Sequence, residues 1–214
     1  SRRAPAADRA AAPVRGAGKG TYGAAMSRAL TLIDGHPGDR VPVCDRGLQY
    51  GDGLFETIAV RGARPCLWQR HWARLTSGCE RLQIPAPDAA LLSANVERLL
   101  VDAEAADGVL KLVLTRGSGP RGYALPPTPR CILAFAPGLP DTSAGAKAGV
   151  RLTLCATHLG ENPRLAGIKH LNRLEQVLAR SEWSDPAVLD GLMCNPHGQV
   201  VCGTMSNVFV LDDN

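Results

Sequence analysis

The chain has 214 residues, of which 45% are hydrophobic and 21% are charged, a composition typical of a globular protein with a buried core. No apolar run reaches the length of about eighteen residues that a transmembrane helix needs, so the sequence predicts none. The net charge of +4 comes from residues 1–25, which hold five basic side chains and one acidic one. The rest of the chain is neutral by count, which excludes a basic face for nucleic acid in the folded part.

Seven cysteines are spread along the chain without a Cys-x-x-Cys pair, and several lie in apolar stretches such as residues 131–133. An odd number of cysteines in apolar surroundings is typical of reduced, buried thiols. We therefore expect no disulfide framework and no metal site, and we predict a cytoplasmic protein.

Residues 1–25 are rich in Ala, Arg, Gly and Pro and show no hydrophobic period, which predicts a disordered extension. A transit peptide has a similar arginine-rich and acid-poor composition. A natural start at Met26 is the interpretation that we favour.

Residues 26–137 are predicted to form an N-terminal α/β domain. Its predicted strands are residues 29–35, 54–60, 109–116 and 131–136. Apolar side chains recur at helical spacing from Trp68 to Leu82, which predicts an amphipathic helix over residues 68–83. Pro87 and Asp88 begin a second predicted helix. Its apolar face consists of Leu92, Val96, Leu99 and Leu100.

An interdomain linker is predicted at residues 138–148, where Gly and Pro recur, and a C-terminal domain at residues 149–214. The predicted strands of this domain are residues 151–157, 188–194, 199–202 and 208–211, with a hairpin turn at residues 195–198. A helix is predicted over residues 171–183, with Leu171, Leu174, Val177 and Leu178 facing inward. The chain stops just after the last predicted strand, so we expect this domain to be truncated.

Lys169 lies in the run Leu165–Val177, between a glycine and the predicted helix. Burial and nearby positive charge lower the pKa of a lysine amine and free its lone pair for nucleophilic chemistry. A lone lysine in front of a helix is usually a solvated surface charge, so the lysine by itself would favour a surface role. The motif around Lys169 favours a catalytic role instead.

The segment Gly167–Leu178, with the sequence GIKHLNRLEQVL, closely resembles the motif of the aminodeoxychorismate lyases, which belong to the fold type IV pyridoxal 5'-phosphate (PLP) enzymes. The resemblance extends from Met26 to Asn214. It implies a two-domain α/β (α+β) fold in which an N-terminal α/β domain precedes a barrel-like C-terminal domain, incomplete here, with PLP between them. It also implies that Lys169 bonds PLP covalently and acts as the general base.

Three further segments carry the resemblance. The segment His71–Leu75 resembles the family's His-x-x-Arg-Leu helix, which implies that Arg74 holds the PLP phosphate rather than lying free on a helix surface. The glycine-rich segment 45–57 resembles the fold type's N-terminal signature, which implies that Phe55 lines the substrate side. The loop 116–123 resembles one that binds a substrate carboxylate in the neighbouring subunit. That likeness implies a homodimer and substrate contacts from Arg121 and Tyr123.

The turn Gly203–Asn207 resembles the family's phosphate-binding turn, which implies cofactor contacts from Gly203, Thr204 and Asn207. One residue earlier the sequence departs from the family. Most members have a glutamate that pairs with the pyridine nitrogen, and this chain has Cys202. A thiol supports a cationic ring only weakly, which disfavours transamination more than a lyase reaction that gives an aromatic product.

The resemblance implies an enzyme that eliminates pyruvate from 4-amino-4-deoxychorismate to give 4-aminobenzoate, a step of folate biosynthesis. Two alternatives remain open at this point. One is an aminotransferase of D- or branched-chain amino acids on the same fold. The other is a non-catalytic, truncated PLP-fold protein, which Cys202 and the expected truncation would favour. No nucleic-acid or membrane partner is expected.

Overall fold

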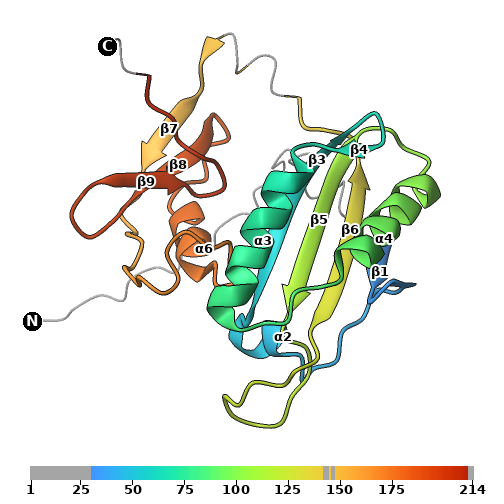
Figure 1. The fold of residues 1–214 in the computed structure, drawn as a ribbon. Helices are drawn as coiled ribbons and strands as arrows, with labels where there is room; N and C mark the ends of the chain where they lie inside the picture. The colour runs from blue at the N-terminus through green and yellow to red at the C-terminus, as the bar shows by residue number, and fades with distance from the viewer. Residues whose placement is uncertain (1–29, 142–144, 146–147, 212–214) are drawn as a thin grey trace, which may run out of the picture.

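The computed structural model describes residues 30–141, 145 and 148–211, so the predicted extension at residues 1–25 lies outside the described residues. Two separate β-sheets with helices beside them make up this part of the chain (Figure 1). Within it, no helix is long and apolar enough to cross a membrane. The mixed helix-and-sheet architecture agrees with the predicted fold class.

The larger sheet has six strands in the order β2-β1-β6-β5-β3-β4, and every neighbouring pair is antiparallel. Its strands are β1 (Leu30–Ile33), β2 (His36–Pro37), β3 (Gly53–Arg61), β4 (Arg64–Pro65), β5 (Gly108–Thr115) and β6 (Arg130–Pro137). The long central pairing joins Gly53–Val60 of β3 to Gly108–Thr115 of β5. The four strands predicted in this region are confirmed, and the two-residue strands β2 and β4 are additional.

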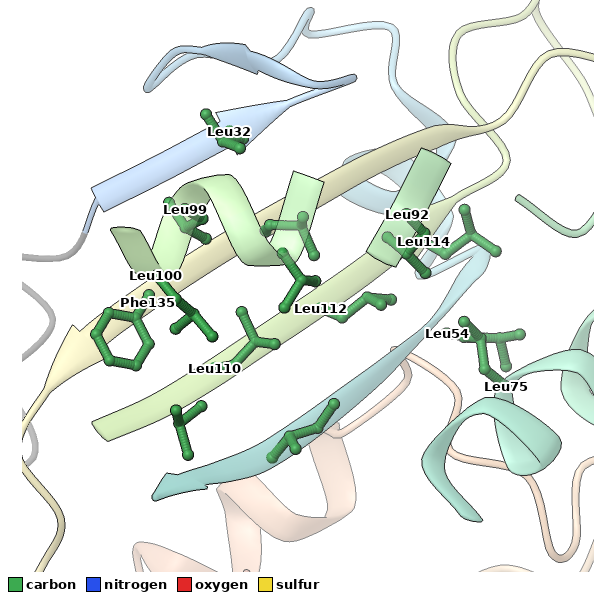
Figure 2. Close-up of a cluster of buried hydrophobic side chains, with 14 of the residues drawn as sticks. Leu32, Leu54, Leu75, Leu92, Leu99, Leu100, Leu110, Leu112, Leu114 and Phe135 are labelled. Atoms are coloured by element: carbon green, nitrogen blue, oxygen red, sulfur yellow. The ribbon is translucent and has the colours of Figure 1, made fainter. Parts of the chain in front are cut away.

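Helices α3 (Trp68–Leu82) and α4 (Ala89–Asp102) cover one face of this sheet (Figure 1). Alternate residues of β3 and β5 point toward the helices, because successive side chains of a strand face opposite ways. Leu110 and Ile58 are completely buried there, and Phe135 of β6 closes the same layer (Figure 2). The apolar face predicted for α4 is confirmed, since all four of its predicted residues are buried.

Helix α4 begins at a side-chain cap. Asp88 has an extended backbone, and its carboxylate accepts a hydrogen bond from the Leu91 amide at 2.7 Å. We expect Asp88→Ala to lower the free energy of unfolding by about 1 kcal/mol, because one amide of the first turn loses its partner. Urea denaturation measures this cost, and Asp88→Ser, which keeps a capping oxygen, should recover most of it. Equal losses in the two variants would contradict the capping role.

The glycine-rich segment before β3 contains a short helix that the sequence did not indicate, α2 (Arg46–Tyr50). Asp45 caps its first turn by accepting from the Gly47 amide, and Gly51 ends it with a left-handed backbone at φ 65°. A side chain at Gly51 would also collide with Asn172, because a Cβ there would lie 2.5 Å from the Asn172 Oδ1 atom. Gly51 therefore lets residue 172 lie against the end of α2.

The smaller sheet consists of β7 (Arg151–Leu154), β8 (Val188–Cys194) and β9 (Val200–Gly203). Strand β8 lies in the middle, parallel to β7 and antiparallel to β9. The predicted turn at residues 195–198 is confirmed, with Gly198 at φ 79°. The strand predicted at 208–211 is wrong, because this segment pairs with no described strand.

Helix α6 (Leu174–Arg180) is shorter than the predicted helix over residues 171–183. The inward orientation predicted for its leucines and valine is also wrong. Leu174 is 70% exposed, Val177 60% and Leu178 52%, whereas Ala179 is completely buried. The reason is that α6 contacts β8 through its small residue, and no described segment covers its larger apolar side chains.

Candidate active site

Lys169 lies beside the first residues of β3, although it is far from them in the sequence. The Lys169 carbonyl accepts from the Phe55 amide at 2.9 Å, and the Leu171 amide donates to the Gly53 carbonyl at 2.9 Å. His170 forms an antiparallel bridge with Leu54, so residues 169–171 act as an extra edge of the large sheet. In such a pairing Lys169 and Phe55 project to the same side, away from the helices.

Three cationic side chains surround the Phe55 ring on this side of the sheet. The Lys169 Nζ atom lies 4.4 Å from the ring centroid, the Arg173 Cζ atom 5.4 Å and the Lys111 Nζ atom 5.7 Å. Each cation is attracted to the ring, but the three repel one another. The cluster therefore favours an anionic ligand. Lys111 was not a predicted site residue, although its outward position in the alternation of β5 was readable from the sequence.

The environment of Lys169 lowers the pKa of its amine. Burial is the largest cause, and the positive charges of Arg74 and Arg173 act in the same direction, while Glu56 opposes them. These are the two effects that the sequence analysis invoked for a nucleophilic lysine. The environment of Lys169 therefore shifts its amine toward the unprotonated form.

The acylation rate of Lys169 reports this effect without any cofactor. In the folded protein, the pH midpoint of its modification by acetic anhydride should lie below that of the same lysine in urea, because a lowered pKa frees the amine at lower pH. Arg173→Met should move the midpoint upward, since a neighbouring positive charge is removed. Peptide mass mapping across a pH series measures both values. A folded midpoint at or above the denatured one would contradict the assignment.

Arg74 projects from α3 toward the same edge of the sheet. Its Nε and Nη2 atoms donate to the two carboxylate oxygens of Glu56 at 2.7 and 2.5 Å. Glu56 is 1% exposed, whereas the Arg74 side chain is 43% exposed. Arg74 is therefore anchored on its buried side and open on the other. Glu56 was not predicted from the sequence.

An open groove of about 930 Å³ lies between the segment on either side of Lys169 and strand β9, and Lys169, Phe55 and Arg74 are not among the residues that line it. The residues that line it include Ile168, His170, Arg173, Gln176, Val201 and Cys202. The buried His170 Nδ1 and Gln176 Oε1 atoms have no hydrogen-bond partner among the described residues. The groove thus offers polar groups to a ligand.

Burial raises the pKa of the Cys202 thiol, and the positive charge of Arg173 counteracts part of this effect. Cys202 is consequently a neutral thiol at physiological pH, able to donate a weak hydrogen bond but without a negative charge. Asp190 raises the pKa of this thiol further and Lys169 lowers it, and burial lowers the pKa of the Arg173 guanidinium.

Asp190 of β8 organises the turn that follows Cys202. Its carboxylate, 4% exposed, accepts from the Ser206 hydroxyl at 2.6 Å and from the hydroxyl of Thr204. The Gly203 amide donates to the Ser206 carbonyl, and the Thr204 amide to the Gly191 carbonyl. Most hydrogen-bond donors of this turn are therefore already bonded to other groups of the protein.

The loop that carries Arg121 and Tyr123 lies against α2. The Arg46 Nη1 atom donates to the Gly122 carbonyl at 2.7 Å, and the Tyr123 ring lies 5.4 Å from the Tyr50 ring. Tyr123 is 81% exposed. Gly122 and Tyr123 therefore hold this loop against α2, and among the described residues neither Arg121 nor Tyr123 makes a hydrogen bond or ring contact with Lys169.

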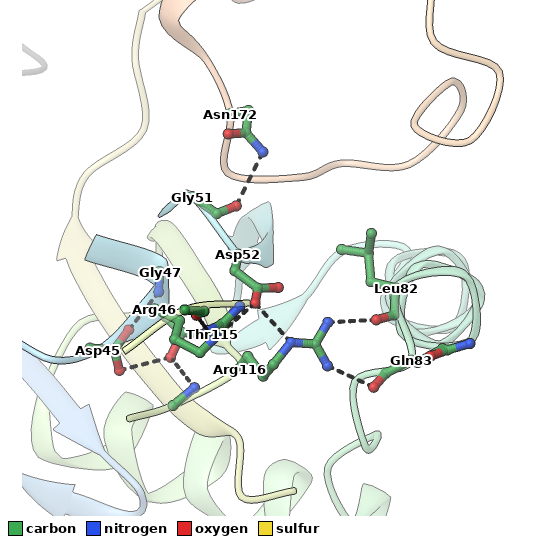
Figure 3. A network of polar contacts seen from close by, with 12 residues as sticks. Asp45, Arg46, Gly47, Gly51, Asp52, Leu82, Gln83, Thr115, Arg116 and Asn172 are labelled. Atoms are coloured by element: carbon green, nitrogen blue, oxygen red, sulfur yellow. Dashed lines mark hydrogen bonds and ion pairs between the residues drawn. The ribbon is translucent and has the colours of Figure 1, made fainter. Parts of the chain in front are cut away.

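Figure 3 shows two buried arginines, Arg46 and Arg116, that meet at the carboxylate of Asp52. The Nε atoms of Arg46 and Arg116 both donate to Asp52 Oδ2, at 2.9 and 2.8 Å. Arg116 also donates to the carbonyls of Leu82 and Gln83, at the end of α3. One carboxylate thus ties α2, β5 and α3 together.

A family model described as amino-transferase class IV matches residues 53–214, which include every predicted site residue. The chain belongs to the class IV aminotransferase family. An aminodeoxychorismate lyase of Vibrio harveyi is 36% identical to this class IV chain over 188 residues, covering 85% of the chain and 67% of that protein.

Solved structures agree with the class IV assignment. The structure of 4-amino-4-deoxychorismate lyase from Pseudomonas aeruginosa is 51% identical with a TM-score of 0.77, over 82% of this chain and 65% of that one. A hypothetical aminotransferase from Mycobacterium tuberculosis in its PLP-bound form is 25% identical with a TM-score of 0.65, over 83% and 66%. The fold type IV prediction is confirmed. The chain spans close to two thirds of the length of these relatives.

Proposed function

We propose that this class IV protein is a PLP-dependent lyase that converts 4-amino-4-deoxychorismate to 4-aminobenzoate and pyruvate, for folate biosynthesis. The observation that carries the proposal is the position of Lys169, whose amine has a lowered pKa and lies within a cluster of cations beside Phe55. The lyases of Vibrio harveyi and Pseudomonas aeruginosa are the relatives on which the choice of reaction rests.

The side chains around Lys169 fit PLP. An unprotonated amine suits the aldehyde of PLP, and the open side of Arg74 suits its phosphate. Cys202, beside the groove, is assigned to the pyridine nitrogen, and Gly203, Thr204 and Asn207 to the phosphate side. Because the Gly203 and Thr204 amides are already engaged, we assign most of the phosphate binding to Arg74. PLP, when bound, supplies an electron sink for the substrate carbon.

Lys169 then removes the C4 proton of the substrate ring, acting as general base. Its lowered pKa increases the fraction of the amine that is free to accept that proton at a given pH. Phe55 lines the substrate side, and Arg121 and Tyr123 bind substrate carboxylates in the site of a second subunit, because the loop that carries them lies against α2. A homodimer follows from this assignment, and we propose that it is cytoplasmic.

Cys202 decides between the lyase and an aminotransferase in this proposal. A neutral thiol leaves the pyridine ring less cationic than a carboxylate would. Transamination needs strong stabilisation of a carbanion, whereas loss of pyruvate here is driven by formation of an aromatic ring. The lyase reaction tolerates the thiol better.

Borohydride reduction of the purified protein with PLP, followed by peptide mass mapping, tests the cofactor site. A phosphopyridoxyl group on Lys169 supports the proposal, and label scattered over other lysines contradicts it. The loaded protein is then given 4-amino-4-deoxychorismate, or D-alanine with 2-oxoglutarate. Formation of 4-aminobenzoate supports the lyase. If the protein instead forms only pyruvate from D-alanine, and no 4-aminobenzoate, the result favours the aminotransferase.

A further inference from the structure

A buried carboxylate lies directly behind Arg74. Glu56 comes from β3, next to Phe55 in the chain, but its side chain points the opposite way, toward α3. Arg74 meets it with two parallel hydrogen bonds, at 2.7 and 2.5 Å. A bidentate pair of this kind fixes the plane of a guanidinium group as well as its position.

His71 adds a third bond to the same carboxylate. It lies one turn before Arg74 on α3, and its Nδ1 atom is 2.7 Å from Glu56 Oε2. Because Glu56 is paired with Arg74 and accepts on both oxygens, the Nδ1 atom of His71 is the donor. Glu56 is thus held from two positions of one helix, and neither oxygen can follow a movement of Arg74.

The remaining side of Arg74 faces away from this carboxylate. Its Nη1 atom has no hydrogen-bond partner among the described residues, and close to half of the side chain is exposed. The same guanidinium lies near enough to Lys169 to affect the charge state of that amine. The charges of the two side chains therefore interact, and the proposed function assigns both side chains to PLP.

We propose that Glu56 is a positioning residue that acts through Arg74, turning the free side of this guanidinium toward the phosphate of PLP, with His71 holding the carboxylate in place. The inference rests on the proposed function. Two effects of Glu56 oppose each other. Its negative charge repels a phosphate, but the opposite charge of Arg74, which pairs with Glu56, offsets this repulsion. Without Glu56, Arg74 has to be ordered when the phosphate binds, which costs about tenfold in affinity.

The experiment compares PLP with pyridoxal, which has the same aldehyde but no phosphate. Dissociation constants for both are measured by absorbance titration on wild type, Glu56→Gln, Arg74→Gln and the double variant. We expect Glu56→Gln to weaken PLP binding about tenfold and to leave pyridoxal binding unchanged. In the Arg74→Gln background the same change should have no further effect, because the two residues act through one contact. Glu80→Gln, an exposed glutamate on the same helix, is the matched control.

Several results would overturn the proposal. Glu56→Gln could weaken the binding of PLP and of pyridoxal equally, strengthen PLP binding, or keep its full effect in the Arg74→Gln background. Each of these outcomes excludes positioning through Arg74. Equal affinities of the wild-type protein for PLP and pyridoxal would show that there is no phosphate site. That result would contradict the proposed function as well. If Glu56→Gln does not fold, His71→Gln tests the same positioning role and leaves the Glu56–Arg74 pair intact. We expect this variant to lose less PLP affinity and to bind pyridoxal as the wild type does.

Discussion

Replacing Lys169 with alanine is expected to lower the rate of 4-aminobenzoate formation about 10³-fold or more, because one substitution removes both the covalent attachment and the general base. The fold should survive, since Lys169 contributes its carbonyl to the pairing with β3 and not its side chain. The rate is followed by the fluorescence of 4-aminobenzoate, and circular dichroism checks the fold.

Lys169→Arg provides the matched control. It keeps a positive charge over the Phe55 ring but cannot bond an aldehyde, so it should be as inactive as the alanine variant. An alanine variant that keeps most of its activity would exclude Lys169 as the catalytic residue. An active arginine variant would show that charge at this position is sufficient.

Replacing Asp52 with alanine is expected to lower the free energy of unfolding by about 3–5 kcal/mol, because it leaves two buried guanidinium groups without a counter-charge. Arg46 and Arg116 are each 3% exposed and share Asp52 Oδ2. Their other hydrogen bonds go to carbonyls, which do not neutralise them. Denaturation in urea, compared with wild type, measures the loss.

Asp185 is the matched control for this prediction. It pairs with Arg151 at the surface, where the two side chains are 54% and 56% exposed. Asp185→Ala should cost no more than about 1 kcal/mol, because solvent screens an exposed pair. Equal costs for the two substitutions would mean that the Asp52 network adds nothing beyond a surface ion pair.

The sequence predicted those helices and strands in which apolar residues recur regularly because one face is buried. Strands β3 and β5 alternate, and α3 and α4 carry apolar stripes, because each has one face against the same core. Helix α2 was missed because it is only five residues long, and it depends on a cap and on Gly51 rather than on a pattern. The apolar side chains of α6 predict a buried face that no described segment covers.

For the candidate site, motifs gave the exposed Arg74 and the partly buried Lys169, and the more deeply buried carboxylates were missed. Lys169 and Arg74 could be found because they stand in recognisable segments. Glu56 and Asp52 could not, because a charged residue in a strand or loop gives no sign in the sequence that it is buried and paired. Their roles depend on contacts between segments far apart in the chain.

The edge pairing of residues 169–171 with β3 has a consequence for motion. Lys169 precedes α6 in the chain, yet its backbone is fastened to the large sheet. If the small sheet swings relative to the large one, the chain has to bend both before Lys169 and after Leu171, because β7 precedes this segment and β8 follows it, and Cys202 would move while Lys169 stays in place. The Leu171 amide should therefore exchange as slowly as the amides of β3, and more slowly than the amides of β9.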